Sequence, residues 1–325
     1  MKESKTNIEP KDANCFPIYY LNDCVISMVE ELKSIGIEAL IADGLGKRIR
    51  FEDLNGQISD IAFLDLSDRI HLSAAYCQFL WSICFVALRM YDGIKVQNEL
   101  ERLNSNERTQ YFEELEKYKE TDTIEELRQY VDWEKCTKIC YSVFESGIEI
   151  INNKIDSFDK YYTLPNATES NQGKVNAIYC YAIVFILNHE ISHFGLKHPY
   201  NVSKSQEEEA DSSAFWTLYS DIEVSKKISA MIGTLAALCS LMFFNESLNG
   251  DDQHPDEDKR VLSALSLIKD EYPHYLGFVI KLFEMWGYYF SYEEYFTKIR
   301  SESTNSEDYF NKILIFFENK KQSNH

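Results

Sequence analysis

The sequence is short of positive charge. It holds 33 lysines and arginines against 53 aspartates and glutamates, which gives a formal net charge of -20 at pH 7. Proteins bind nucleic acids largely through cations that neutralise phosphates, so most of such a surface would repel a nucleic acid. We therefore expect no direct binding to nucleic acid.

The sequence also lacks the features of a secreted or membrane-spanning chain. Its first residues are polar, so no signal peptide is expected. The apolar run 177–187 is shorter than the roughly 20 residues of a membrane span. The longer run 228–244 is interrupted by Ser229, Gly233 and Ser240. Buried helices explain both runs, and the expected location is the cytoplasm, with no membrane partner.

The cysteines do not form a metal-binding cluster. Eight are scattered along the chain, and Cys136 and Cys140 are four apart, so on a helix they share a face. A tetrahedral site built on this pair would need a second pair. The cysteines are interpreted as reduced core thiols, as expected in a reducing compartment.

Helical periodicity dominates what is present. Apolar residues make up 45% of the chain and aromatic residues 14%, which is enough for a large core. Near the N-terminus, the segments 37–42 and 48–52 flank Asp43-Gly44-Leu45-Gly46, a pattern typical of a β-hairpin. The predicted fold is mainly α (α+β), with a small N-terminal β-hairpin or sheet element.

Two regions are predicted along the chain: residues 1–66 with the β element, and a mainly helical domain over residues 67–325. A polar stretch at 164–173 is the predicted internal linker. Helical patterns cover 70–91 (closed by Asp92-Gly93), 99–127, 133–158, 174–198, 205–221, 223–245, 257–270, 274–287 and 304–319.

The segment from His189 to His193 has the pattern His-Glu-x-x-His. Residues four apart lie about 40° apart around a helix, so the two imidazoles project together. Two imidazoles presented in this way can bind one Zn²⁺ ion, and Glu190 is placed to activate a water molecule by taking its proton. The alternative is a helix whose histidines are ordinary core or surface residues.

A third metal ligand is expected in the acidic segment that follows. Glu207 and Asp211 are four residues apart and share a helix face. The segment looks like the second helix of a gluzincin site, in which Glu207 binds the metal and Asp211 fixes the tautomer of a ligand histidine. Glu208 is the alternative ligand. The alternative interpretation of the whole segment is a solvated, acidic helix start.

The metzincin pattern fails on spacing. It places glycine three and histidine six residues after the second ligand histidine. Here Gly195 and His198 fall at two and five residues after His193. His198 is therefore expected to be a helix-end residue or a pocket contact rather than a metal ligand.

A further fragment, residues 251–260, contains His254 and ends at Arg260. It resembles the His-Pro…Arg segment that follows the zinc site in several gluzincin peptidases. The resemblance implies that His254 helps to hold the oxyanion, which suits a reaction that develops negative charge on oxygen, and that Arg260 anchors the loop. An ordinary loop histidine is the alternative.

Taken together, these segments resemble the Lit-like phage-exclusion peptidases, a family of bacterial cytosolic zinc proteases. The segment 72–81 looks like the family's N-terminal Leu-Trp helix. The helix end at 195–198 is close to the family's Leu-Gly-His ending, with Lys197 in place of glycine. The block 207–211 matches as well. The expected active-site helices lie at about 174–221 in a gluzincin-like metallopeptidase.

The resemblance implies a zinc endopeptidase of antiviral, abortive-infection defence. Its partners would be a protein or peptide substrate and an activating peptide or protein, since the family's named member cleaves elongation factor Tu, a host translation factor, when a phage peptide is bound. Two alternatives stay open: a zinc-binding sensor or interaction protein without hydrolytic activity, and a stress-response protease that cleaves a repressor. Glu190 argues against the first, because a structural metal site needs no general base.

Overall fold

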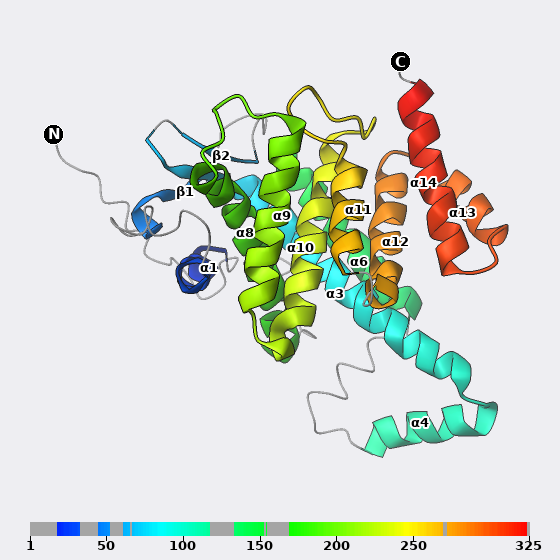
Figure 1. The fold of residues 1–325 in the computed structure, drawn as a ribbon. Helices are drawn as coiled ribbons and strands as arrows, with labels where there is room; N and C mark the ends of the chain where they lie inside the picture. Colours follow the sequence, from blue (N-terminus) through cyan, green and yellow to red (C-terminus); the bar gives the residue numbers. More distant parts are fainter. Residues whose placement is uncertain are drawn as a thin grey trace.

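Three long apolar helices form the centre of the molecule (Figure 1). They are α3 (Ala74–Arg102), α8 (Glu169–Gly195) and α10 (Lys227–Leu241), and each contacts the other two. The structure is a computed structural model that describes residues 18–32, 45–52, 61–65, 67–117, 133–152, 154, 169–268 and 272–323. Because residues on all sides of α10 are buried, this helix is surrounded by protein rather than lying on the surface.

The other helices lie around this centre or extend away from it (Figure 1). They are α1 (Ile18–Glu31), α4 (Ser105–Lys117), α6 (Trp133–Ile151), α9 (Lys204–Asp221), α11 (Glu257–Leu267), α12 (Tyr272–Tyr289), α13 (Glu293–Ser301) and α14 (Ser306–Ser323), with short 3₁₀ turns η1 (Leu45–Lys47), η2 (Val224–Lys226) and η3 (Met242–Phe244). The predicted mainly α fold with a small β element is confirmed. Helices α1 and α13 were not predicted. The predicted linker over 164–173 was wrong in its second half, because residues 169–173 form the start of α8, and residues 164–168 lie outside the described residues.

A small mixed sheet lies against the C-terminal half of α8. Its strands are β1 (Ile49–Glu52), β2 (Ala62–Leu64) and β3 (Ile70–Ser73), in the order β1-β3-β2. β1 runs parallel to β3, and β2 runs antiparallel to it with Phe63 opposite His71. The segment 37–44 of the predicted hairpin lies outside the described residues. The central strand β3 follows residue 66, so the sheet joins the two predicted regions.

The prediction of a helix over 70–91 was wrong at both ends. Residues 70–73 form β3, and the helix begins only at Ala74, because the Ser73 side chain accepts the Tyr76 N–H at 3.2 Å and caps it. The helix also continues past Gly93 to Arg102. A Cβ atom at position 93 would lie 2.1 Å from the Trp133 ring, so this glycine makes room for α6 rather than ending α3.

Three helical segments are long and apolar enough to cross a membrane by length and composition alone: Ala74–Arg102, Gly173–Gly195 and Val224–Phe244. In the structure 89%, 78% and 72% of their most apolar windows are buried inside the molecule. Packing of these helices against one another therefore accounts for their composition.

Candidate metal centre

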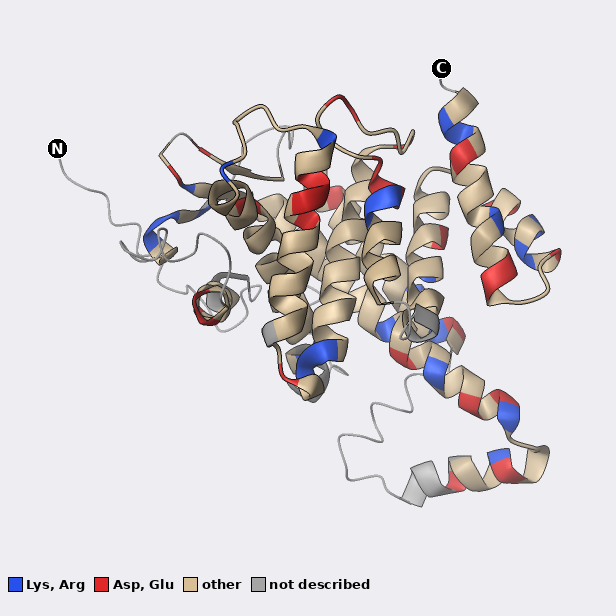
Figure 2. Cartoon of the chain, viewed as in Figure 1, with Lys and Arg blue, Asp and Glu red and all other residues tan. Residues whose placement is uncertain are grey.

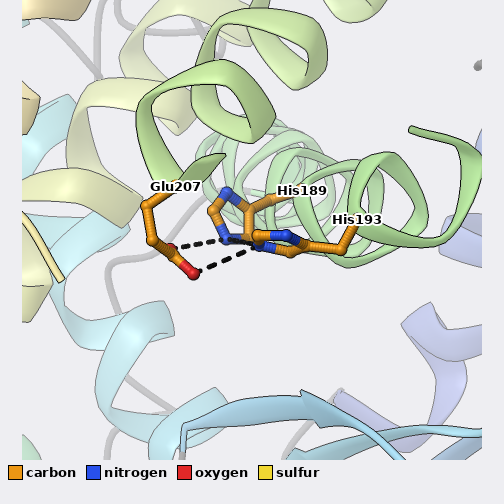
Figure 3. A group of neighbouring side chains, drawn as sticks. All are labelled: His189, His193 and Glu207. Carbon is orange, nitrogen blue, oxygen red and sulfur yellow. Dashed lines mark hydrogen bonds and ion pairs between the residues drawn. The ribbon is translucent and has the colours of Figure 1, made fainter. Parts of the chain in front are cut away.

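The centre is built where the end of α8 meets the start of α9. His189 and His193 lie one turn apart on α8, and their Nε2 atoms are 3.0 Å apart. Glu207, in the first turn of α9, places Oε2 3.2 Å from His189 Nε2 and Oε1 3.3 Å from His193 Nε2. The three side chains point toward one another from the two helices (Figure 3).

The start of α9 is fixed by its own sequence. Ser203 and Gln206 form a capping box, in which the Ser203 N–H donates to Gln206 Oε1 at 2.9 Å. Next to the centre, Ser192 of α8 and Ser213 of α9 join the two helices, with their Oγ atoms 2.9 Å apart. The first turns of α9 are rich in acidic side chains (Figure 2), but Glu207 is buried whereas Glu208 is exposed. The structure thus brings Glu207, and not Glu208, to the histidines.

Behind His189 lies a buried ion pair. His189 Nδ1 is 2.9 Å from Asp211 Oδ1. Arg260 of α11 donates two hydrogen bonds of 2.7 Å to the same carboxylate, one from Nε to Oδ2 and one from Nη2 to Oδ1. The resemblance implied that Arg260 anchors a loop. The structure shows that it holds Asp211, which in turn faces His189.

The electrostatics of the centre favour a cation. Burial opposes a charge on His189, but Asp211 and Glu207 outweigh burial and raise the pKa of His189 to about 10. Burial would likewise raise the pKa of the Glu207 carboxyl, but the two histidines outweigh it and hold this pKa well below its ordinary value. The site therefore favours positive charge, and without a metal ion a proton on His189 supplies that charge.

The donor set fits a metal ion. With their protons on Nδ1, His189 and His193 would each direct an Nε2 lone pair toward the Glu207 carboxylate. These ligand atoms all lie within 4.8 Å of one another, and they form the one such group found among the described residues. Three electron-rich groups this close repel one another unless a cation lies between them. Two imidazoles and one carboxylate also match the ligands that a catalytic zinc ion takes.

A cavity of about 950 Å³ lies in front of the centre. Its wall includes all three candidate ligands together with Glu190, the next residue after His189. Burial raises the pKa of the Glu190 carboxyl, although both histidines oppose the shift. A carboxylate with a raised pKa beside a metal position is suited to accept a proton from water.

The strand β2 also lines the cavity, with Ala62, Phe63 and Leu64. Among the described residues β2 pairs with β3 alone, so its other edge is open. The hydrogen bonds from Asp65 N to Arg69 O (2.8 Å) and from Ser73 N to Ile61 O (3.1 Å) set the register. Backbone groups therefore alternate, and those of Ala62 and Leu64 point to the open edge.

His254 lies on the cavity wall, where its side chain contacts Asp251 rather than the three candidate ligands. Its side chain is 51% exposed, and Nδ1 lies 3.1 Å from both carboxylate oxygens of Asp251. Its role at an oxyanion stays a prediction. His198 also lines the cavity, and its Nδ1 is 2.8 Å from His193 Nδ1, a contact that spacing alone did not predict.

The fold and the site together define a class: a mainly helical protein in which two histidines and a glutamate could hold a metal ion at the wall of a large cavity. The family model Peptidase U49 matches residues 70–277, which is more than half of the chain. The chain therefore belongs to the peptidase U49 family, and it is a peptidase. No curated protein and no solved structure matches it.

Proposed function

We propose that this peptidase is a zinc-dependent endopeptidase of the gluzincin type. The observation that carries the proposal is the convergence of His189, His193 and Glu207 on one point beside Glu190. Asp211 orients His189 from behind. A purely structural metal site has no use for a free carboxylate and a cavity next to the ion, which favours catalysis over sensing.

Zinc, when bound, would polarise the attacking water and the scissile carbonyl. Glu190 takes a proton from the water as the water oxygen bonds to the carbonyl carbon. It then delivers that proton to the amide nitrogen as the carbon–nitrogen bond breaks, which releases an amine and a carboxylic acid. His254 stabilises the oxyanion in this proposal, by swinging from Asp251 toward the cavity, which its exposed side chain permits.

The open edge of β2 supports an extended peptide as the substrate. A peptide that pairs with the outward-facing N–H and C=O groups of Ala62 and Leu64 would run along the cavity that the three candidate ligands also line. Pairing through backbone groups is independent of side-chain identity. The side chains that line the rest of the cavity would then select the sequence that is cleaved.

The wider role follows the likeness to the Lit-like phage-exclusion peptidases, which the motifs at 189–211 support. We infer a cytoplasmic protease of abortive-infection defence that cleaves a host protein, such as a translation factor, once an activating peptide or protein binds. The net charge of -20 supports protein partners over nucleic acid. The burial of the apolar helices supports a chain that works away from the membrane.

The test is metal content, measured by elemental analysis of the purified chain. Wild type is expected to carry about one zinc per chain, and both His193→Ala and Glu207→Ala are expected to lose it. Glu208→Ala is the matched control, because this neighbouring glutamate is exposed and should leave the zinc in place. Absence of zinc in wild type, even after reconstitution, would refute the proposal.

Glu190→Gln separates metal binding from catalysis. It is expected to keep the zinc and to lose hydrolysis, because glutamine cannot accept the proton. Mass spectrometry of a mixture of purified bacterial translation factors, incubated with each form, measures cleavage. A Glu190→Gln protein that cleaves as well as wild type would show that another group is the base.

A further inference from the structure

His198 is buried directly behind the candidate ligand His193. Its side chain is 4% exposed, and its Nδ1 atom lies 2.8 Å from His193 Nδ1. On its other side, His198 Nε2 lies 3.3 Å from Glu209 Oε2 on α9. The Glu209 side chain is 60% exposed. These three side chains thus form a row of contacts that leads from the centre to the surface.

The end of α8 places His198 there. The N–H of His198 donates to His193 O at 3.0 Å, and the N–H of Lys197 donates to Phe194 O at 3.2 Å. Lys197 has a φ of 58°, in the left-handed region. These are the two hydrogen bonds and the left-handed residue of a Schellman motif. The motif reverses the chain so that His198 returns to the level of His193.

Within this row of side chains, each ring proton has one position that is consistent with the contacts. A metal ion would take the Nε2 lone pair of His193, so the proton of His193 is on Nδ1. That N–H can donate only to a lone pair on His198 Nδ1, which puts the proton of His198 on Nε2. The His198 Nε2–H then faces the Glu209 carboxylate. The neutral histidines and the ionised glutamate therefore agree in tautomer and charge without any extra proton.

We propose that His198 is a positioning residue, which accepts the Nδ1–H of His193 and so fixes the tautomer and ring orientation of this metal ligand, with Glu209 holding His198 in turn. This inference rests on the proposed metal site. It gives each ligand histidine its own support: a buried, charged pair of Asp211 and Arg260 behind His189, and a neutral imidazole behind His193. Outer partners of this kind raise the basicity of a ligand imidazole and reduce its freedom.

Four variants test the inference through zinc affinity, measured by competition with a chromophoric chelator. His198→Phe keeps a ring but removes the acceptor, and its zinc Kd is expected to rise about 10- to 100-fold. His198→Asn places an amide oxygen close to the position of Nδ1, so it is expected to restore most of the affinity. Glu209→Gln should have a smaller effect than His198→Phe. Glu208→Gln is the matched control for Glu209→Gln, because the neighbouring Glu208 is exposed, and it should bind zinc like wild type.

The outcomes separate the two proposals. If wild type binds zinc and His198→Phe binds it equally well, the positioning role is wrong and the metal site stands. If His198→Asn and His198→Phe lose affinity equally, an acceptor near the position of Nδ1 does not restore zinc binding, and the inference fails. If wild type binds no zinc, the proposed function itself fails. Thermal unfolding of the metal-free variants checks that each has folded. If a His198 variant has a lowered unfolding temperature, the comparison of Glu209→Gln with wild type replaces it.

Discussion

The side chains around the candidate metal centre differ in how they are held. Arg260 and Asp211 are mostly buried, with side chains 12% and 14% exposed, and they are joined by two hydrogen bonds. Removing one member of such a pair leaves an uncompensated buried charge, whereas removing both does not. Variants of this pair can therefore separate an effect on stability from an effect on metal binding.

The first prediction concerns this pair. Arg260→Leu is expected to lower the free energy of unfolding by about 3 kcal/mol, because Asp211 loses the two hydrogen bonds and the positive charge that Arg260 supplies. The double variant Asp211→Leu/Arg260→Leu should recover most of that stability. It should still bind zinc more weakly than wild type, since His189 then lacks its outer partner. Urea unfolding of the metal-free proteins and chelator competition measure the two quantities, and a double variant with normal zinc affinity would contradict the role of Asp211.

Among the elements, the end of α8 is strained by its sequence. Lys197 has a φ of 58°, where residues other than glycine pay a steric penalty. The position is also exposed, so its side chain can be changed without disturbing the core.

The second prediction is that Lys197→Gly stabilises the chain by about 1 kcal/mol, because glycine adopts the left-handed conformation without strain. Lys197→Ala is the control, since it removes the same charge but keeps a Cβ atom. Chemical denaturation of the metal-free protein measures both. Equal stability of the glycine and alanine variants would show that backbone strain at this position is negligible.

The strand β2 gives a prediction about substrate binding. Ala62→Pro removes one N–H from the open edge without removing a hydrogen bond to β3. It is expected to raise KM for a cleaved peptide several-fold while zinc content and unfolding temperature stay unchanged. Ala62→Val, which keeps the N–H, serves as the control. Steady-state kinetics on the peptide measures the effect, and an unchanged KM would place the substrate elsewhere in the cavity.

At the scale of the whole molecule, the C-terminal helix α14 is tied to the helix that carries Arg260. Lys321 of α14 donates to Asp258 at 2.6 Å and to Asp256 at 2.9 Å, at the start of α11. Its side chain is 7% exposed and that of Asp258 is 1% exposed. The match to the Peptidase U49 model ends at residue 277, so α14 lies beyond the matched segment and still supports it.

The fourth prediction is that Lys321→Met lowers the free energy of unfolding by about 3 kcal/mol at neutral pH, because Asp258 is left without its buried partner. Burial opposes the charge on Lys321, but Asp258 and Asp256 outweigh burial and raise the pKa of Lys321 above its ordinary value. The stabilising contribution is thus fully present below the ordinary lysine pKa and is lost as the pH rises through the raised value.

The difference in stability between wild type and Lys321→Met should accordingly shrink at strongly alkaline pH. Guanidinium unfolding of both proteins at neutral and alkaline pH measures this difference, in which the titrations of all other groups largely cancel. A difference that stays constant with pH would show that the loss comes from packing of the lysine stem rather than from its charge.

The sequence by itself determined the features that depend on local spacing. Helical periodicity and apolar content predicted the mainly α fold. The four-residue spacing of His189 and His193 put both imidazoles on one side of a helix, and the same spacing put Glu207 and Asp211 on one face of the next. These properties follow from the geometry of one helix, and that geometry is the same wherever the helix lies in the molecule.

Only the tertiary structure decided how these faces meet. It turned residues 70–73 into the central strand of a sheet, because they pair with β1 and β2, and it brought the open edge of β2 to the cavity in front of the histidines. It also placed Arg260 against Asp211 and His198 against His193. Such contacts depend on the packing of elements that are distant in sequence or on a single chain reversal. Neither leaves a periodic pattern in the order of the residues.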